Sequence, residues 1–278
     1  MPPRPSSPAN PGEHALAAEP ICEIRGLSFR YSPQAPLALD RVSLTLRQGD
    51  RVALMGPNGS GKSTLLHLLA GAIGADTKAI HWRFDDGRRP LTGLVLQQPD
   101  LMLIEETVRA EAEFAPRQLG MRRRERIQAA ESAMSRMGLL GLASEPPFAL
   151  SRGQRLRAAM ASVLSMRPRI LLLDEPTTGQ DREQIERMMD GLAETADLIV
   201  FCTHDIETAA RHSTRVVALA GGKIIGDAAT RDALFDDELL QAACLRPSPI
   251  QAFARRLGLR ALTDDELFEA LGGGKARP

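Results

Sequence analysis

The residues best suited to chemistry form a short glycine-rich segment between a predicted strand and a predicted helix. In order they are Gly56, Pro57, Asn58, Gly59, Ser60, Gly61, Lys62, Ser63 and Thr64. Glycines allow successive backbone N–H groups to converge on phosphate oxygens, and the amino end of the following helix adds a favourable potential. Lys62 would reach the β- and γ-phosphates of a nucleotide, and the Ser63 hydroxyl would bind Mg²⁺. The alternative is a glycine-rich turn without a ligand, but the flanking elements favour a phosphate site.

Two neighbouring carboxylates, Asp174 and Glu175, follow the apolar run Ile170–Leu173. At the tip of a buried strand, such a pair can serve two roles in phosphoryl transfer. Asp174 would hold the Mg²⁺ shell, and Glu175 would polarise the water that attacks the γ-phosphate. Two acids in this position can also cap the next helix, yet their combination with the phosphate loop favours the catalytic role.

These residues need strands that end at one edge of a sheet. Predicted apolar strands alternate with helices, which indicates an α/β fold whose parallel sheet is covered on both faces. Ligands of such sheets bind beyond the carboxyl ends of the strands, where the candidate residues fall. The predicted strands cover residues 21–31, 42–46, 51–55, 79–84, 93–97, 169–173, 198–203 and 215–220, and the predicted helices cover 62–70, 107–140 with breaks near Pro116 and Gly120, 151–166, 182–194 and 205–212.

The composition is that of a globular protein with a sizeable core, since 43% of the 278 residues are apolar and 25% are charged. The 35 basic and 35 acidic residues balance, so net charge gives no reason to expect nucleic acid as a partner. Three cysteines, Cys22, Cys202 and Cys244, form no paired spacing and fit a reducing compartment. No apolar run approaches the roughly 20 residues that a membrane helix needs.

We expect three regions: a disordered N-terminal tail over 1–19, a nucleotide-binding domain over 20–235 and a small helical C-terminal module over 236–278. The tail is rich in proline and lacks the apolar core of a signal peptide. After Gly226 the predicted elements change to short amphipathic helices at 236–243, 250–257 and 264–271.

A further segment, LSRGQ at 150–154, lies about twenty residues before the acidic strand end. With Gln97, Asp181 and His204 in the same order, this arrangement closely resembles the nucleotide-binding subunits of ATP-binding-cassette (ABC) transporters. The resemblance covers residues 21–235 and depends on five motifs in order. It implies a P-loop NTPase of the ABC type, with a mixed, mainly parallel sheet, a small antiparallel arm and a helical signature subdomain.

In that family two subunits bind two ATP molecules head to tail between them. The resemblance implies that Ser151, with Gly153, Gln154 and the amino end of their helix, contacts the γ-phosphate held by the Lys62 loop of the other subunit. Ser151 as a plain helix N-cap is compatible with this role, because the same exposed amino end serves both.

The resemblance assigns roles to four more residues. Tyr31 would stack on adenine, although it can also be an ordinary strand residue. Gln97 would touch Mg²⁺ and the attacking water, and Asp181 would cross the dimer interface. His204 would contact the γ-phosphate; a lone histidine at a strand end is more often structural, but its Thr-His-Asp context favours the catalytic role. The predicted catalytic set is Lys62, Gln97, Glu175 and His204, and the predicted Mg²⁺ ligands are Ser63, Gln97 and Asp174.

Some positions depart from the family pattern. Arg152 stands where glycine is usual, and it can either aid charge neutralisation or crowd the closure of the dimer. Gln180 and Arg182 replace the leucine and proline that usually flank the interface aspartate. These departures leave nucleotide binding intact and lead us to expect slow hydrolysis until a partner presses two subunits together.

Within the superfamily, residues 97–100, 105–115, 237–240 and 262–267 look most like energy-coupling-factor (ECF) ATPases, including those of cobalt and nickel transporters. The resemblance implies uptake of a trace metal, with cobalt as the first choice, or of a vitamin. Transport would require a membrane coupling subunit and a substrate-binding membrane subunit. The chain would lie at the cytoplasmic face of the inner membrane, as a homodimer or paired with a related ATPase.

Residues 99–114 would form the groove for a coupling helix of the membrane subunit. The four apolar residues 101–104 would supply its surface, and Asp100, Glu105 and Glu106 would receive arginines. The alternative is that the apolar residues are core and the acids are solvated. Four consecutive large apolar residues cannot all face inward on a helix, which favours docking.

Two other functions deserve comparison with transport. A soluble ABC-type ATPase clamp acting on DNA or the ribosome is disfavoured by the short distance in sequence between Lys62 and Ser151 and by the single cassette. A nucleotide sensor without hydrolysis is disfavoured because Glu175 and His204 are both present.

Overall fold

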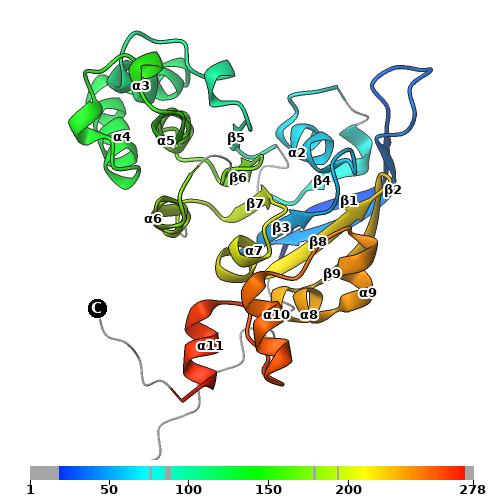
Figure 1. The fold of residues 1–278 in the computed structure, drawn as a ribbon. Coiled ribbons are helices and arrows are strands. Elements are labelled where there is room, and N and C mark those ends of the chain that lie inside the picture. The colour runs from blue at the N-terminus through cyan, green and yellow to red at the C-terminus, as the bar shows by residue number, and fades with distance from the viewer. Residues whose placement is uncertain (1–18, 75–76, 85–88, 178–179, 193, 273–278) are drawn as a thin grey trace, which may run out of the picture.

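The computed structural model describes residues 19–74, 77–84, 89–177, 180–192 and 194–272. All but the last residue of the predicted tail, 1–19, lies outside them. The described chain forms a six-stranded sheet, a three-stranded sheet and helices packed on both (Figure 1). The six-stranded order is β5 (Thr92–Val95), β6 (Ile170–Leu173), β7 (Leu198–Cys202), β3 (Arg51–Met55), β8 (Arg215–Ala220) and β9 (Lys223–Ala229), and the three-stranded order is β2 (Leu39–Arg47), β1 (Pro20–Phe29) and β4 (Ile80–Trp82).

The carboxyl ends of the parallel strands are aligned. Val95 at the end of β5 pairs with Leu173 of β6, Leu173 pairs with Phe201 of β7, and Leu54 of β3 pairs with Cys202. The segments after these four neighbouring strands therefore start at one edge of the sheet. They carry, in the order β5, β6, β7 and β3, Gln97, the Asp174–Glu175 pair, His204 and the glycine-rich loop.

Helices cover both faces of the main sheet, which confirms the predicted fold class. On one face, α2 packs between the two sheets (Figure 1). On the other, side chains of α3 to α9 contribute to one hydrophobic core. The helices are α2 (Lys62–Ala70), α3 (Val108–Gln118), α4 (Arg123–Arg136), α5 (Arg152–Leu164), α6 (Arg182–Leu192), α7 (Ile206–His212), α8 (Thr230–Phe235), α9 (Asp237–Ala242), α10 (Pro249–Arg256) and α11 (Asp264–Ala270).

Strand β3 contributes to two hydrophobic cores because its side chains alternate between the faces of the sheet. Val52 and Leu54 pack with α2 and the three-stranded sheet. Ala53 and Met55 pack on the opposite face, in the core that includes α5 and α7. The strand is buried on both sides, which explains its continuous apolar sequence.

Two details predicted from the sequence are wrong. Pro116 does not break α3: the helix continues to Gln118 and ends just before Gly120, the other predicted break. The helix starts within one residue of the predicted position, with Thr107 as its N-cap, and the Thr107 side chain accepts the N–H of Ala110. The chain does not turn to helices at Gly226, since β9 continues to Ala229 and pairs antiparallel with β8.

The C-terminal helices pack against α8 and β9. Gln251 of α10 is fully buried, and its Nε2 donates to the carbonyl of Leu234 at 2.6 Å. Gly226 of β9 allows a close approach, because a Cβ there would lie 2.4 Å from Cδ1 of Leu239. Within the described residues, no helix combines the length and the apolar character required to cross a membrane.

Candidate functional site

The loop between β3 and α2 needs glycine for its shape. Gly56, Gly59 and Gly61 have φ values of 139°, 79° and 103°, in a region that other residues rarely adopt. A Cβ on Gly56 would lie 2.0 Å from the carbonyl oxygen of Leu219, and one on Gly61 would lie 2.6 Å from the carbonyl oxygen of Ala38. The loop is therefore fixed by local backbone geometry, and it leads directly into the amino end of α2.

Lys62 and Ser63 begin α2 and point back over the loop and toward β6. The Lys62 ammonium is buried and donates to the carbonyl oxygens of Gly56 at 2.8 Å and Pro57 at 3.1 Å. The Ser63 hydroxyl donates to Oδ1 of Asp174 at 3.0 Å. A buried cation and a hydroxyl–carboxylate pair thus flank the glycine-rich loop at the amino end of α2, which suits the phosphates of a nucleotide.

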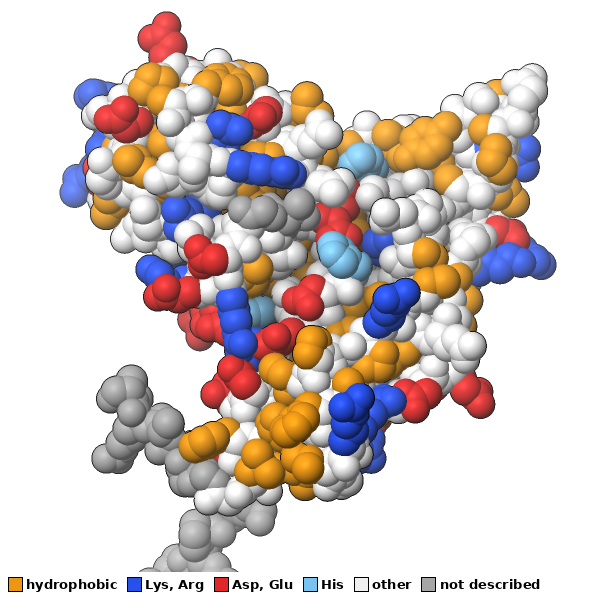
Figure 2. Space-filling view, viewed as in Figure 1, with side chains coloured by type: hydrophobic (Ala, Val, Ile, Leu, Met, Phe, Trp, Pro, Cys, Tyr) orange, Lys and Arg blue, Asp and Glu red, His pale blue; other side chains and the backbone are white. Residues whose placement is uncertain are grey.

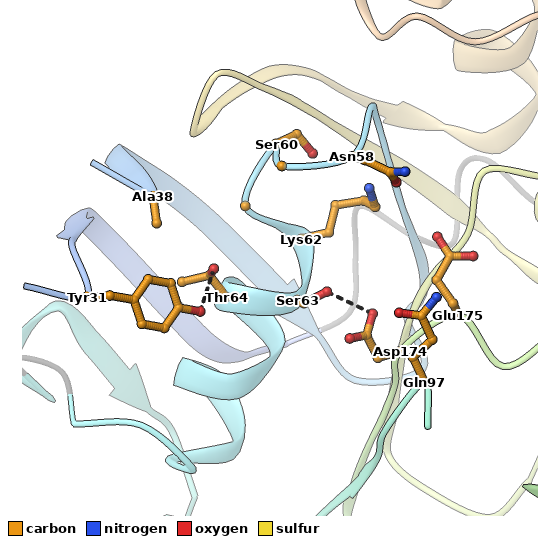
Figure 3. A pocket seen from close by; sticks show the side chains of 12 residues that line it. Tyr31, Ala38, Asn58, Ser60, Lys62, Ser63, Thr64, Gln97, Asp174 and Glu175 are labelled. Carbon is orange, nitrogen blue, oxygen red and sulfur yellow. Dashed lines mark hydrogen bonds between the residues drawn. The ribbon is translucent and has the colours of Figure 1, made fainter. Parts of the chain in front are cut away.

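These groups line one cavity of about 280 Å³. Figure 3 shows Tyr31 at one end of it, Gln97, Asp174 and Glu175 at the other, and the loop between them. Its described lining consists of Tyr31, Ala38, Asn58, Gly59, Ser60, Gly61, Lys62, Ser63, Thr64, Gln97, Asp174 and Glu175.

Glu175 and His204 form a hydrogen-bonded pair next to the cavity. His204 Nδ1 lies 3.0 Å from Oε2 of Glu175, and the two residues come from the ends of the neighbouring strands β6 and β7. The Glu175 side chain is 11% exposed, whereas that of His204 is 73% exposed. Glu175 also has a φ of 49°, an unfavourable conformation for a side-chain-bearing residue that tends to occur at functional sites.

Tyr31 lies beyond the end of β1 with one face open. Its hydroxyl is 3.0 Å from Oγ1 of Thr64, and its ring meets Phe29 edge-on with centroids 5.1 Å apart. The residue is 63% exposed, so these contacts orient the ring without covering it. An exposed, oriented aromatic face at the mouth of the cavity is suited to stacking on a base.

Five predicted nucleotide-binding residues do not line this cavity within one chain: Gly56, Ser151, Gly153, Gln154 and Asp181. Gly56 belongs to the loop itself, whereas the other four lie at the starts of α5 and α6. Ser151 and Gln154 form a capping box on α5, with Gln154 N–H donating to Ser151 Oγ at 3.3 Å and Ser151 N–H to Gln154 Oε1 at 2.9 Å. Asp181 accepts the N–H of Gln184 at 2.9 Å and so caps α6. Each of the two segments is ordered by its own hydrogen bonds.

Sequence reasoning missed one residue of the described cavity lining. Ala38 lines the cavity, but alanine carries no chemical signal that would mark it in a sequence. Cys202 lies fully buried beneath the site. Burial, with the nearby Asp174 carboxylate, raises the pKa of the Cys202 thiol well above its usual range, so this cysteine is a neutral packing residue.

The oxygen donors at one end of the cavity fit Mg²⁺. Ser63 and Asp174 are hydrogen-bonded to each other, and the Gln97 amide lies beside them (Figure 3). Mg²⁺ prefers such oxygen ligands and commonly takes few from the protein and the rest from phosphates and water. Among the described residues, no group of three or more His, Cys, Asp or Glu side chains is placed to hold a metal ion. The donor set therefore fits an ion that arrives with a nucleotide.

This chain is similar to known proteins in sequence and in fold. The family model described as ABC transporter matches residues 39–178. A putative ABC transporter ATP-binding protein of Methanosarcina mazei is 40% identical in an alignment of 280 positions, which covers 97% of this chain and 47% of the relative. A second relative, from Methanosarcina acetivorans, is matched by this chain over 40% of its length. The chain thus spans less than half the length of these relatives.

Two shorter relatives are covered more fully. The energy-coupling factor transporter ATP-binding protein EcfA of Methanothermobacter thermautotrophicus is 33% identical over 91% of this chain and 88% of its own length. The cobalt import ATP-binding protein CbiO of Rhodobacter capsulatus is 37% identical over 82% of this chain and 85% of its own length. Among solved structures, cbiO1 from Clostridium perfringens, part of the ABC transporter complex cbiONQ, matches with a TM-score of 0.71 and 27% identity over 86% of this chain and 96% of that one.

Proposed function

The chain belongs to the ABC transporter ATP-binding family, and from this premise we propose that it binds and hydrolyses ATP with Mg²⁺ as one half of a closing dimer. The observation that carries the proposal is the convergence of the glycine-rich loop, the acidic strand end and the Glu175–His204 pair on one cavity. These groups follow the ends of three adjacent strands, β6, β7 and β3, so the sheet itself assembles the site.

Binding of the triphosphate would rest on the loop and its lysine. The Lys62 ammonium would exchange its bonds to the Gly56 and Pro57 carbonyls for phosphate oxygens. Ser63, Asp174 and Gln97 would hold Mg²⁺, which would neutralise charge on the β- and γ-phosphates when bound. The open face of Tyr31 would receive the adenine.

Hydrolysis would depend on Glu175. Its carboxylate would accept a proton from the water that attacks the γ-phosphate. The His204 contact at 3.0 Å would hold that carboxylate at the edge of the cavity. Because His204 is largely exposed, it can also exchange this bond for one to the γ-phosphate.

The second half of each site would come from another copy of the chain or from a related ATPase. Ser151 and the amino end of α5 stay outside the cavity of their own chain yet are exposed. An ordered serine with a helix amino end is complementary to a phosphate presented by a partner. Asp181, at the start of α6, is exposed in the same way and would cross the interface.

Glu175→Gln tests this proposal. The amide keeps the shape of the side chain but cannot accept the proton, so turnover should fall by about 10² to 10⁴ while ATP binding persists. The variant should dimerise when ATP is added, which sedimentation can measure. Unchanged phosphate release by E175Q would contradict the role of Glu175, and a monomer at saturating ATP would contradict the closing dimer.

We further propose that the dimer drives an ECF-type importer of a trace metal, with cobalt first and nickel next, or of a vitamin. The names of the EcfA and CbiO relatives support this class. The chain would then act at the cytoplasmic face of the membrane through a coupling subunit and a substrate-binding subunit. Exposed apolar side chains next to Gln97 also support a docking partner: Leu101 is 70% and Ile104 64% exposed.

The proposed docking segment is held in shape by a buried acid. Glu111 is 1% exposed, and its Oε2 accepts the N–H groups of Ile104 at 2.8 Å and Glu105 at 2.9 Å. Of the acids predicted to receive arginines, Asp100 and Glu105 already form ion pairs within the chain, while Glu106 is exposed. Met102 and Leu103 face inward, so only half of the apolar run offers surface.

Purification of the native complex tests the transport proposal. Membrane subunits should co-purify with the chain, and Ile104→Asp should reduce their recovery without loss of ATP binding. Recovery of only soluble partners would instead support an ABC-type clamp. The identity of the substrate-binding membrane chain would decide between cobalt, nickel and a vitamin.

A further inference from the structure

The C-terminal helix α11 is tied to two helices of the nucleotide-binding domain. Arg182 Nη2 of α6 lies 2.8 Å from both carboxylate oxygens of Asp264, the first residue of α11. Arg211 of α7 also contacts Asp264, and its Nη1 lies 2.9 Å from Oδ2 of Asp265. We call these four residues the α11 clasp. Figure 2 shows basic and acidic side chains gathered in this part of the molecule, where the C-terminal helices meet the rest of it in Figure 1.

The arginines of the clasp are held from a second side as well. Arg182 Nε lies 3.0 Å from Glu186, and its Nη2 lies 2.9 Å from Glu207. Glu207 also pairs with Arg211, whose side chain is only 17% exposed. Burial alone would raise the pKa of Asp264, but the hydrogen bond from Arg182 and the nearby positive charges outweigh it and lower that pKa. The carboxylate is therefore ionised at neutral pH, and the guanidinium groups have little freedom.

The start of α6 is anchored on its other side by the LSRGQ segment, residues 150–154. Gln180 packs against Gly153 of α5, where a Cβ would lie 3.5 Å from Cγ of Gln180 and 3.3 Å from Oε1 of Gln184. Gln180 Nε2 donates to the carbonyl of Pro176 at 3.1 Å. Asp181 thus lies between two anchors: the residue before it packs against α5, and the residue after it is bound to α11.

We propose that Asp264, acting through Arg182, is a positioning residue that holds Asp181 in place for the opposing subunit. This inference rests on the proposed function, in which Asp181 crosses the dimer interface. An exposed side chain at a helix start contributes more to an interface when its backbone is already placed, because ordering it on binding costs conformational entropy. Arg182 lies directly beside Asp181 in the first turn of α6, so the bond to Asp264 restricts that turn.

The dimerisation of chains trapped with ATP measures this effect. In the E175Q background, Asp264→Asn should weaken ATP-driven dimerisation about threefold to tenfold, the range expected for a partly exposed ion-pair network. Binding of a fluorescent ATP analogue to the monomer should not change, because Asp264 does not line the cavity. Asp264→Glu should restore part of the loss. The control is Glu269→Gln, which removes an exposed charge from the same helix and should have no effect.

Arg182→Ala identifies the route of the effect. If Asp264 acts through Arg182, the R182A/D264N double variant should dimerise no worse than R182A alone. The proposal would be overturned if D264N dimerised as tightly as its parent while thermal unfolding curves showed that both proteins are folded. Additive losses in the double variant would also overturn it.

Hydrogen exchange separates a failure of this inference from a failure of the proposed function. Should the parent stay monomeric with ATP, the dimer proposal falls, but the first turn of α6 can still be followed in the monomer. The backbone N–H of Gln184 donates a hydrogen bond to Asp181, and it should exchange faster in D264N than in E269Q. Equal exchange rates in the two variants would refute the positioning role.

Discussion

Replacing Ser151 should separate the two roles of one hydroxyl. In the isolated chain, Ser151 closes the capping box of α5 with Gln154, through hydrogen bonds of 3.3 and 2.9 Å. Removal of an N-cap side chain costs about 1 kcal/mol of folding stability when alanine replaces it, and only a few tenths when glycine does. S151A should therefore unfold at a lower temperature than S151G, and both should still fold.

The effect on the dimer should be larger and should not depend on the replacement. In the proposed closed dimer, each Ser151 also donates to a γ-phosphate, and a hydrogen bond to a charged group contributes about 1.5 to 3 kcal/mol. A symmetric dimer contains two such bonds, so both variants lose about 3 to 6 kcal/mol, or more than about 100-fold in the dimerisation constant.

Sedimentation of the E175Q background with saturating ATP measures that constant, and thermal unfolding measures the capping effect. Ser248 provides a matched control, because it caps α10 by accepting the N–H of Gln251 at 3.1 Å and lies outside the nucleotide cavity. S248A should lose stability as S151A does and should dimerise normally. If S151G dimerised as tightly as its parent, helix capping would be the whole role of Ser151.

Three further changes have defined outcomes. Gly56→Ala should weaken ATP binding at least about tenfold, measured by titration with a fluorescent analogue, because its Cβ would meet the Leu219 carbonyl in a left-handed backbone. The pKa of Asp264 is lower in the folded chain than its unfolded value of about 3.9. The stability that Asp264 contributes should therefore be present above about pH 3.9 and be lost as the pH falls through the lower folded value. Unfolding curves of wild type and D264N should differ near pH 7 and converge in strong acid. A thiol reagent should modify Cys244 rapidly and the two buried cysteines only on unfolding; rapid modification of all three would contradict the described packing.

Much of the site was predictable because its parts are local in sequence. Lys62 follows an apolar strand and glycines at 56, 59 and 61, the local pattern that predicts a phosphate loop between a strand and a helix. Asp174 and Glu175 follow a strand of four buried residues, so their place at the carboxyl edge follows from the sheet. The bounds of β3 and α2 match the prediction.

Other features depend on tertiary contacts that no local pattern encodes. Strand β9 is half-exposed and contains Gly226, and it forms because β8 offers an open edge for antiparallel pairing. The α11 clasp joins Arg182 to Asp264 across 82 positions, and surface charges give no indication of their partners until helices are docked. Glu111 likewise resembles an ordinary helical acid in the sequence, although it is buried and holds the 104–105 backbone.

Because β3 belongs to both hydrophobic cores, it affects how the molecule unfolds. Every second side chain of the strand that leads into the loop belongs to a different core, so loss of either core exposes one whole face of that strand. Because both cores include β3, neither core can stay folded after the other has unfolded. The two layers should accordingly melt together in one cooperative step, and a nucleotide bound at the loop should protect both at once.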